Sequence, residues 1–460
     1  MAHEILRTLL DWVEVFRPAL TRPGYSNALV VFVGWVLSSG PHAVTQALVM
    51  TDVARRRHHE RFHRFFSRGT WSPDEIGRLL FERILTFVGD DAPIHVALDD
   101  TLAAKKGPQV FGIGSHIDAV RSTKRFRVFC FGHVWVVLSV VIRLPFSGRP
   151  WALPVLFRLY RNQKECLAKG DGYRKKTELG RELVDIVAGW AGCRRVHLAA
   201  DGAYCNDTLM RGLAPTVTVF GAMRPDAVLT ALPTEEEKRA TGRRRVRGRV
   251  LPKPEKLAQS ERHPWQSCKA DLYGRLRTVW FKTIEAQWYR ACGRELVRIV
   301  VVKCEGGAIP FRVFVCTNPS IAVSTVLETY AGRWAIEVSF RDLKQQLGFA
   351  DSSARKRAAV ERTAPFVGFI YTTLVLWFAH TAWQTDVATP PVRPWYRHKR
   401  HFSFADVLRA AQRTLAPLDV LDPASSLDNL RVAPRPSAAT STRRRSRGTN
   451  APPTALKRVA

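Results

Sequence analysis

The sequence predicts an α/β protein built on a mixed β-sheet with helices. Strand-like and helix-like segments follow in the order strand, strand, strand, helix, strand, helix, strand: 94–98, 126–143, 151–160, 173–191, 196–200, 203–213 and 216–220. That order is typical of a mixed α/β sheet. Two acidic sites, Asp99-Asp100 and Asp201, directly follow strands. Open α/β sheets place their ligand sites at the carboxyl ends of strands, so these acids are candidate functional residues.

The N-terminal region, residues 1–90, is expected to be helical. Apolar residues recur at helical spacing near the N-terminus, and residues 27–53 resemble two short helices joined by a Ser-Ser-Gly-Pro turn. Ser72-Pro73 is a good helix start, with Ser at the N-cap and Pro in the first turn. The run from Arg55 to His63 holds three histidines, and we interpret it as a basic helix facing solvent or DNA rather than a metal site.

The sheet pattern of residues 91–223 is interrupted by a mostly β insertion, residues 224–319. The insertion opens with a hydrophilic stretch rich in arginine, and β-like segments follow near 276–284, 296–303 and 311–316. The core then resumes over 320–430, beginning with a long helix at 323–347. Residues 431–460 contain eight Lys and Arg and no acid, so we expect a disordered basic tail.

The charge balance points to a polyanionic partner. Lys and Arg number 71 against 40 Asp and Glu, which gives a formal net charge of +31. Such a surface attracts nucleic acid above all, with an anionic membrane surface as the other candidate. Arginine suits bidentate contacts with phosphate. Basicity alone does not distinguish a protein that cuts nucleic acid from one that reads or coats it.

The cysteine pattern argues against a zinc ribbon or finger, because no two of the eight cysteines form a C-x-x-C pair. Scattered cysteines fit a reducing compartment, and we expect a cytoplasmic protein associated with the nucleoid. Residues 364–383 carry no formally charged residue. This stretch is long enough to cross a membrane, but we interpret it as a buried core helix and expect no membrane partner.

The segment from Tyr330 to Lys344 carries the most informative pattern. On a continuous helix, Arg333, Glu337 and Lys344 lie within about 40° of one another, and Arg341 borders the same face. One interpretation is a surface network in which Glu337 pairs with cations four residues away on either side. The other is that Glu337 binds a metal ion and the surrounding cations bind DNA phosphates.

Residues 330–344 match, position for position, the Y-(2)-R-(3)-E-(6)-K signature of bacterial insertion-sequence transposases of the DDE class. The order of parts is similar too, because an acid after a first strand, an acid after a later strand and a β-rich insertion precede the glutamate helix. The resemblance covers residues 90–385 or so. It favours the metal-binding interpretation of Glu337.

The resemblance implies a ribonuclease-H-like fold in which three carboxylates bind two Mg²⁺ or Mn²⁺ ions. Asp201 and Glu337 carry over as the second and third acids, and the first is Asp100 or its neighbour Asp99, of which we favour Asp100. The two point to opposite faces of the sheet. The residues expected to bind DNA are Tyr330, Arg333, Arg341 and Lys344, together with Arg243, Arg244 and Arg245 of the insertion.

The implied function is transposition. Two divalent ions activate the attacking oxygen and stabilise the leaving oxygen of a phosphodiester. Oxygen ligands suit such hard metals, hence Asp and Glu. The expected partners are the terminal inverted repeats of a transposon and a target DNA, bound by a homodimer. The alternatives are a transposase-derived DNA-binding protein that has lost cutting and a membrane protein. Trp265, Trp280 and Trp288 are interpreted as core aromatics rather than base-stacking residues.

Overall fold

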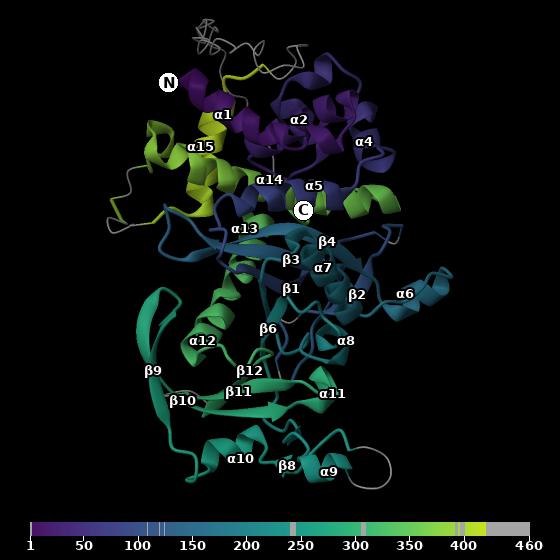
Figure 1. The fold of residues 1–460 in the computed structure, drawn as a ribbon. Coiled ribbons are helices and arrows are strands. Elements are labelled where there is room, and N and C mark those ends of the chain that lie inside the picture. The colour runs from purple at the N-terminus through teal and green to yellow at the C-terminus, as the bar shows by residue number, and fades with distance from the viewer. Residues whose placement is uncertain are drawn as a thin grey trace, which may run out of the picture.

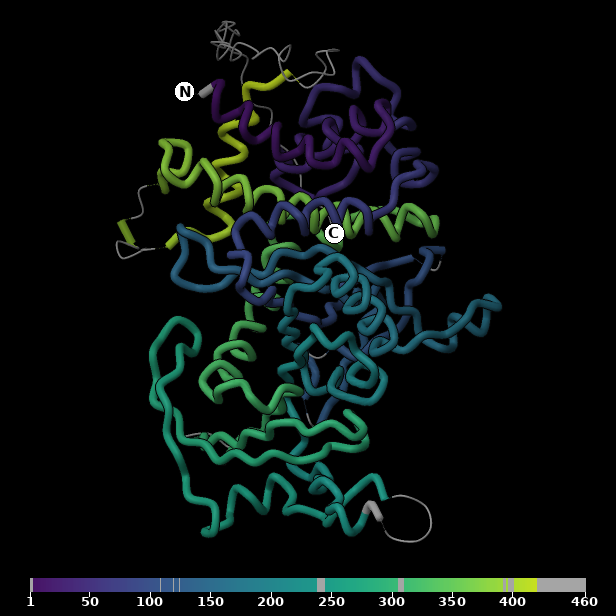
Figure 2. Tube along the Cα trace, viewed as in Figure 1, coloured from purple at the N-terminus to yellow at the C-terminus, as the bar shows by residue number. Residues whose placement is uncertain are grey.

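The computed structural model describes residues 2–107, 109–118, 120–123, 125–239, 245–304, 310–391, 394–395 and 401–419. A large β-sheet occupies the middle of the molecule, helices from both ends of the chain lie on one side of it, and the β-rich insertion lies on the other (Figure 1). The first and last described helices come together on the helical side (Figure 2). The basic tail, residues 431–460, lies outside the described residues, as do Arg243 and Arg244.

The N-terminal region is helical, as expected. Its helices are α1 (Ala2–Glu14), α2 (Arg22–Leu37), α3 (Val44–Met50), α4 (Glu60–Ser67) and α5 (Pro73–Leu85). Helix α5 begins after the N-cap Ser72 with Pro in its first turn, as the sequence indicates. In the basic run, Arg55 ends a short 3-10 helix and Glu60 begins helix α4. Its buried side chains are the phenylalanines Phe62, Phe65 and Phe66, so the histidines border a packed apolar face.

The central sheet contains five core strands in the order β4-β3-β1-β5-β6: Pro150–Tyr160, Phe129–Arg143, Ile94–Ala104, Val196–Ala200 and Val217–Ala222. Strand β3 pairs antiparallel with both β4 and β1, whereas β5 pairs parallel with both β1 and β6. Strand β2 (Gly114–Ile117) also pairs with β3. The helices of this part are α6 (Gln163–Ala168), α7 (Lys176–Ala191) and α8 (Asp207–Met210). The predicted fold class, an α/β protein with a mixed sheet and a helical N-terminal region, is confirmed.

The insertion extends this sheet rather than forming a separate one. Strand β12 pairs antiparallel with β6, and β11, β10, β7 and β8 follow outward, with β9 on β10. The strands are β7 (Leu229–Thr230), β8 (Val250–Leu251), β9 (Gln266–Leu272), β10 (Arg275–Gln287), β11 (Leu296–Lys303) and β12 (Phe311–Cys316). Short helices lie between them: α9 (Glu235–Arg239), α10 (Pro254–Gln259) and α11 (Tyr289–Cys292).

The long helix expected at 323–347 is two helices, α12 (Val323–Gly332) and α13 (Trp334–Gln346), so that expectation is wrong in detail. The break falls at Arg333, directly after Gly332, which is a weak helix former. The amide of Arg333 donates to the carbonyl of Tyr330, and the amide of Ile336 donates to the carbonyl of Arg333. These three-residue turns tighten the junction, and α13 then packs on β4 and β1.

The apolar stretch lies within α14 (Arg357–His380), the one described helix that is long and apolar enough to cross a membrane. In this structure 94% of its most apolar window is buried inside the protein, against β4, α4 and α5. Its polar atoms are used internally, since Thr372 donates to the carbonyl of Pro154 at 2.9 Å. The last described helix, α15 (Phe404–Leu415), packs against it. The helix therefore serves as the core of the helical side.

Candidate active site

The first acidic pair lies inside strand β1, not at its end as expected. The parallel pairing of β1 with β5 is last seen at Leu98 opposite Ala200, whereas the antiparallel pairing with β3 continues through both aspartates. The parallel register therefore places Asp99 and Asp201 next to each other, one residue beyond the last pair. Because side chains alternate along a strand, Asp99 and Asp100 lie on opposite faces of the sheet.

Asp99 lies on the face covered by α13. The guanidinium of Arg333 donates to Asp99 Oδ2 at 2.5 Å and to Glu337 Oε1 at 3.0 Å. The Arg333 side chain is only 12% exposed. It joins an acid of strand β1, Asp99, to an acid of helix α13, Glu337, which lies 238 positions later in the chain (337 minus 99). The break before α13 places Arg333 at the start of this helix, one turn before Glu337.

The second acid, Asp201, belongs to the same electrostatic neighbourhood. It directly follows β5, and its carboxylate accepts a hydrogen bond from the amide of Gly202 at 2.7 Å. Its negative charge contributes to the raised pKa values of Asp99, Tyr330 and Arg333. Tyr330 packs against Phe314, with ring centroids 4.8 Å apart, and the Arg333 guanidinium lies 5.7 Å from its ring. Three signature residues, Tyr330, Arg333 and Glu337, thus lie together with Asp99 and Asp201.

The negative charges of this cluster outnumber its positive charges. Burial, together with the charges of Asp100 and Asp201, raises the pKa of Asp99 to about 6, against the opposing effects of Arg333 and of the hydrogen bond from the Asp100 amide. The pKa of Arg333 is lowered by burial but raised overall by Asp99, Tyr330, Glu337 and Asp201. Within the described residues, Arg333 is the cation that forms ion pairs with these acids. Three carboxylates around one guanidinium leave an excess of negative charge.

Asp100, which we favoured as the first acid, lies on the other face of the sheet, and this placement supports the alternative, Asp99. Lys176, the first residue of α7, donates to Asp100 Oδ2 at 2.7 Å, and the hydroxyl of Tyr204 donates to Oδ1 at 3.0 Å. Burial and the Asp100 carboxylate both raise the pKa of Tyr204, so the phenol stays a donor. Asp100 faces neither Arg333 nor Glu337. The physical reason is the alternation of side chains, since α13 covers the face to which Asp99 points.

Comparison with known families supports the same region of the chain. A family model described as DDE superfamily endonuclease matches residues 15–282, which is more than half of the sequence. The chain belongs to the DDE superfamily of endonucleases. The matched range includes Asp201 and both candidates for the first acid, Asp99 and Asp100, but ends before Glu337.

Other comparisons add little to this family assignment. No curated protein matches this DDE endonuclease. Among solved structures, the cryo-EM structure of a piggyBac transposase synaptic complex with hairpin DNA matches with 10% sequence identity and a TM-score of 0.41. The match covers 90% of this chain and 78% of that chain. The likeness is too distant to transfer any property of that protein.

The donor set of this DDE endonuclease fits a divalent metal in its chemistry. Asp99, Asp201 and Glu337 supply oxygen ligands, which hard cations prefer, and their excess negative charge favours an added cation. In the arrangement seen, the Arg333 guanidinium stands between Asp99 and Glu337. No three metal-binding side chains are grouped closely enough to hold an ion anywhere in the described part of the chain. Binding an ion to all three acids therefore requires Arg333 to move.

The remaining predicted DNA-binding residues of the DDE endonuclease lie apart from this cluster. Arg341 forms an ion pair with the buried Asp342 at 2.9 Å. Partial desolvation lowers the pKa of Lys344, although its side chain reaches solvent, and the nearby carboxylate of Asp118 opposes that shift. In the insertion, the guanidinium of Arg245 lies 3.5 Å from the carboxylate of Glu237. Of the cations expected to share one face with Glu337, Arg333 is the one seen to contact it among the described residues. Arg341 pairs with Asp342 instead, and Lys344 lies about two turns further along α13.

Several residues near the site were not identified from the sequence. Lys176 and Tyr204 complete the Asp100 network, and Trp334, which follows Arg333, is 51% exposed. No sequence pattern distinguishes these residues, since their relevance depends on which strands are neighbours. Of the three insertion tryptophans, Trp265 and Trp288 are partly buried as expected, whereas Trp280 is 45% exposed and is therefore not a core residue.

Proposed function

We propose that this DDE endonuclease is a DNA transposase that cleaves transposon ends and joins them to target DNA. The observation that carries the proposal is the meeting of Asp99, Asp201 and Glu337 around Arg333, from three segments far apart in the sequence. Structural ion-pair networks also bring charges together, but they normally balance them. Here three acids share one cation, which is typical of a site that recruits further positive charge.

Asp99, Asp201 and Glu337 are the residues that would hold two Mg²⁺ or Mn²⁺ ions. When bound, such ions activate a water or 3′-hydroxyl and stabilise the leaving oxygen of the phosphodiester. Glu337 and Asp99 would orient their oxygens toward the same side of the sheet. Arg333, released from the two acids, would bind a DNA phosphate, and Tyr330 beside it would limit its movement.

The partners proposed are double-stranded DNA carrying terminal inverted repeats and a target duplex. The net charge of +31 supports binding of a polyanion. A homodimer on DNA and a place in the bacterial cytoplasm, at the nucleoid, are parts of the same proposal. Arg341, Lys344 and Arg245 are proposed to contact DNA outside the catalytic cluster, where they are exposed.

The experiment is an end-cleavage assay. The protein is incubated with a duplex carrying its flanking inverted repeat, with Mg²⁺, Mn²⁺ or EDTA, and the strands are separated on a denaturing gel. We expect nicks at the transposon end with either metal and none with EDTA. Binding of end DNA without cleavage under every metal condition would overturn the proposal in favour of a transposase-derived binding protein.

A further inference from the structure

A second feature of the surface has no role in the catalytic cluster. The hairpin formed by β2 and the start of β3, which we name the aromatic ribbon, exposes five large apolar side chains: Ile117 (48%), Val120 (96%), Phe126 (69%), Phe129 (62%) and Phe131 (65%). Phe129 pairs directly with Ile117 across the two strands, and Phe131 is two residues further along β3. These three therefore share one face of the ribbon. Side chains exposed to this extent contribute little to the folded core.

The ribbon is also basic. Arg121, Arg125 and Arg127 are exposed on it, and Asp118 is the acid among its described residues. Phe129 and Phe131 form one wall of a depression of about 660 Å³. Lys105, Lys106 and Arg355 contribute to the same depression, and Asp351 is the acid of its lining. Cations therefore surround an exposed aromatic surface.

The ribbon lies near the C-terminal end of helix α13. Asp118, on the ribbon, is close enough to Lys344 for its carboxylate to oppose the lowering of the Lys344 pKa by desolvation. The depression is also lined by residues 350–355, which begin four positions after the end of α13 at Gln346. A DNA strand leaving the region of Glu337 along the signature helix would reach the ribbon next.

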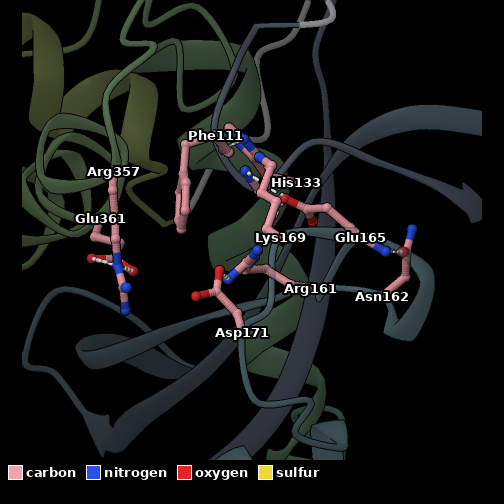
Figure 3. Close-up of polar contacts among 10 residues, drawn as sticks. Phe111, His133, Arg161, Asn162, Glu165, Lys169, Asp171, Arg357 and Glu361 are labelled. Atoms are coloured by element: carbon pink, nitrogen blue, oxygen red, sulfur yellow. Dashed lines mark hydrogen bonds and ion pairs between the residues drawn. The ribbon is translucent and has the colours of Figure 1, made fainter. Parts of the chain in front are cut away.

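The root of the ribbon is firmly anchored, as Figure 3 shows around Phe111. His133 donates to the carbonyl of Phe111 at 2.9 Å, and the Phe111 amide donates to the carbonyl of Arg355. Cations surround the Phe111 ring, with Arg161 at 4.7 Å and Arg357 at 5.4 Å from its centre. The fold thus fixes the base of the ribbon and leaves its outer aromatics uncovered.

We propose that the aromatic ribbon binds unpaired bases of the DNA substrate, which stack on Phe129 and Phe131 while the arginines contact the phosphates. Proteins that bind single strands combine an aromatic stacking surface with a positively charged track in this way. A second copy of this chain fits less well, because two basic ribbons would repel each other. This inference rests on the proposed function in one respect only, that the substrate is DNA.

The test compares three fluorescent probes in EDTA: a blunt duplex, the same duplex with an unpaired end of four thymidines, and single-stranded DNA. Base stacking on an aromatic side chain is worth about 1–3 kcal/mol. We expect the double variant Phe129→Ala/Phe131→Ala to bind the two unpaired probes about 10- to 100-fold more weakly, with a change under about threefold for the blunt duplex. The matched control is Val250→Ser, an exposed apolar residue of the insertion, which should change none of the three affinities.

Two further measurements keep the test decisive. Phe129→Trp/Phe131→Trp should restore binding, and 2-aminopurine in the unpaired end should be quenched by the wild type and not by the double alanine variant. Equal losses on blunt and unpaired probes, or none, would overturn the inference. So would a dimer that the double variant converts to monomer without change in DNA affinity. Because no cleavage is measured, failure of the cleavage assay leaves this result interpretable, and the reverse also holds.

Discussion

The two faces of strand β1 carry neighbouring aspartates in opposite surroundings. Asp100 has its own cation, Lys176, and its own hydroxyl donor, Tyr204, both within 3.0 Å. Asp99 shares one guanidinium with Glu337 and lies beside Asp201. A carboxylate with its own cation and hydrogen-bond donor stabilises the fold. A cluster of carboxylates that outnumber their cations destabilises it unless a further cation binds. Charge balance, more than residue type, therefore distinguishes Asp100, which has a structural role, from Asp99, which is the catalytic candidate.

The largest expected effect tests this comparison directly. Asp99→Asn removes an oxygen ligand, and metal assistance is worth several kcal/mol of the barrier, so end cleavage should fall by at least about 100- to 1000-fold. Asp100→Asn keeps a side chain that accepts from Tyr204 and should lower cleavage by less than about tenfold. Single-turnover cleavage rates with Mn²⁺ measure both. The reverse ranking would show that Asp100 is the first acid after all.

Glu337→Gln should have an effect of similar size on cleavage, since the amide preserves the volume but loses the charge that attracts a metal ion. Binding of end DNA should stay within about threefold, because the affinity depends mainly on phosphate contacts. Cleavage and gel-shift assays on the same preparation separate the two properties. Cleavage near the wild-type rate would return Glu337 to the role of a surface ion-pair partner.

Part of this site could be predicted from sequence and part could not. Strand order, Asp201 and the signature from Tyr330 to Glu337 follow from local patterns, because each lies within one segment. The choice between Asp99 and Asp100 depends on which face of β1 the distant helix α13 covers, and no local pattern records that. The break between α12 and α13 was not predicted, because a single glycine within a helical pattern is often tolerated without a break.

The next effect concerns the cations. Arg333→Ala should weaken binding of transposon-end DNA by about tenfold to a hundredfold, because a charge-assisted bond to phosphate is worth about 1.5–3 kcal/mol. Arg409→Ala, on α15 and paired with Asp406, is the matched control and should change the affinity by less than about threefold. Titrations of end DNA at fixed salt give both values.

The affinity for Mn²⁺ distinguishes two roles for Arg333. If Arg333 serves DNA, the loss of its charge should leave Mn²⁺ binding intact or strengthen it, because a competing cation is removed from Asp99 and Glu337. Isothermal titration of the DNA-free protein measures this. Weaker Mn²⁺ binding with unchanged DNA affinity would mean that Arg333 acts only by holding the two acids in place.

The smallest effect is expected on the opposite face. Tyr204→Phe removes one buried hydroxyl that donates to Asp100 and leaves the ion pair with Lys176 in place. A hydrogen bond to a charged group contributes about 1.5–3 kcal/mol, and the remaining partner compensates in part, so the loss of unfolding free energy should be about 1–2 kcal/mol.

Tyr204 also lies three residues after Asp201, and its amide donates to the Asp201 carbonyl. Its hydroxyl thus links the turn after the second acid to strand β1. If this link only stabilises the fold, the cleavage rate of the folded protein should change by less than about threefold, and Mn²⁺ affinity should not change. Urea unfolding, Mn²⁺ titration and single-turnover cleavage of the same variant distinguish the outcomes. A loss of Mn²⁺ affinity comparable to that of Asp99→Asn would show that the two faces of β1 are coupled and that Asp100 is not a purely structural residue.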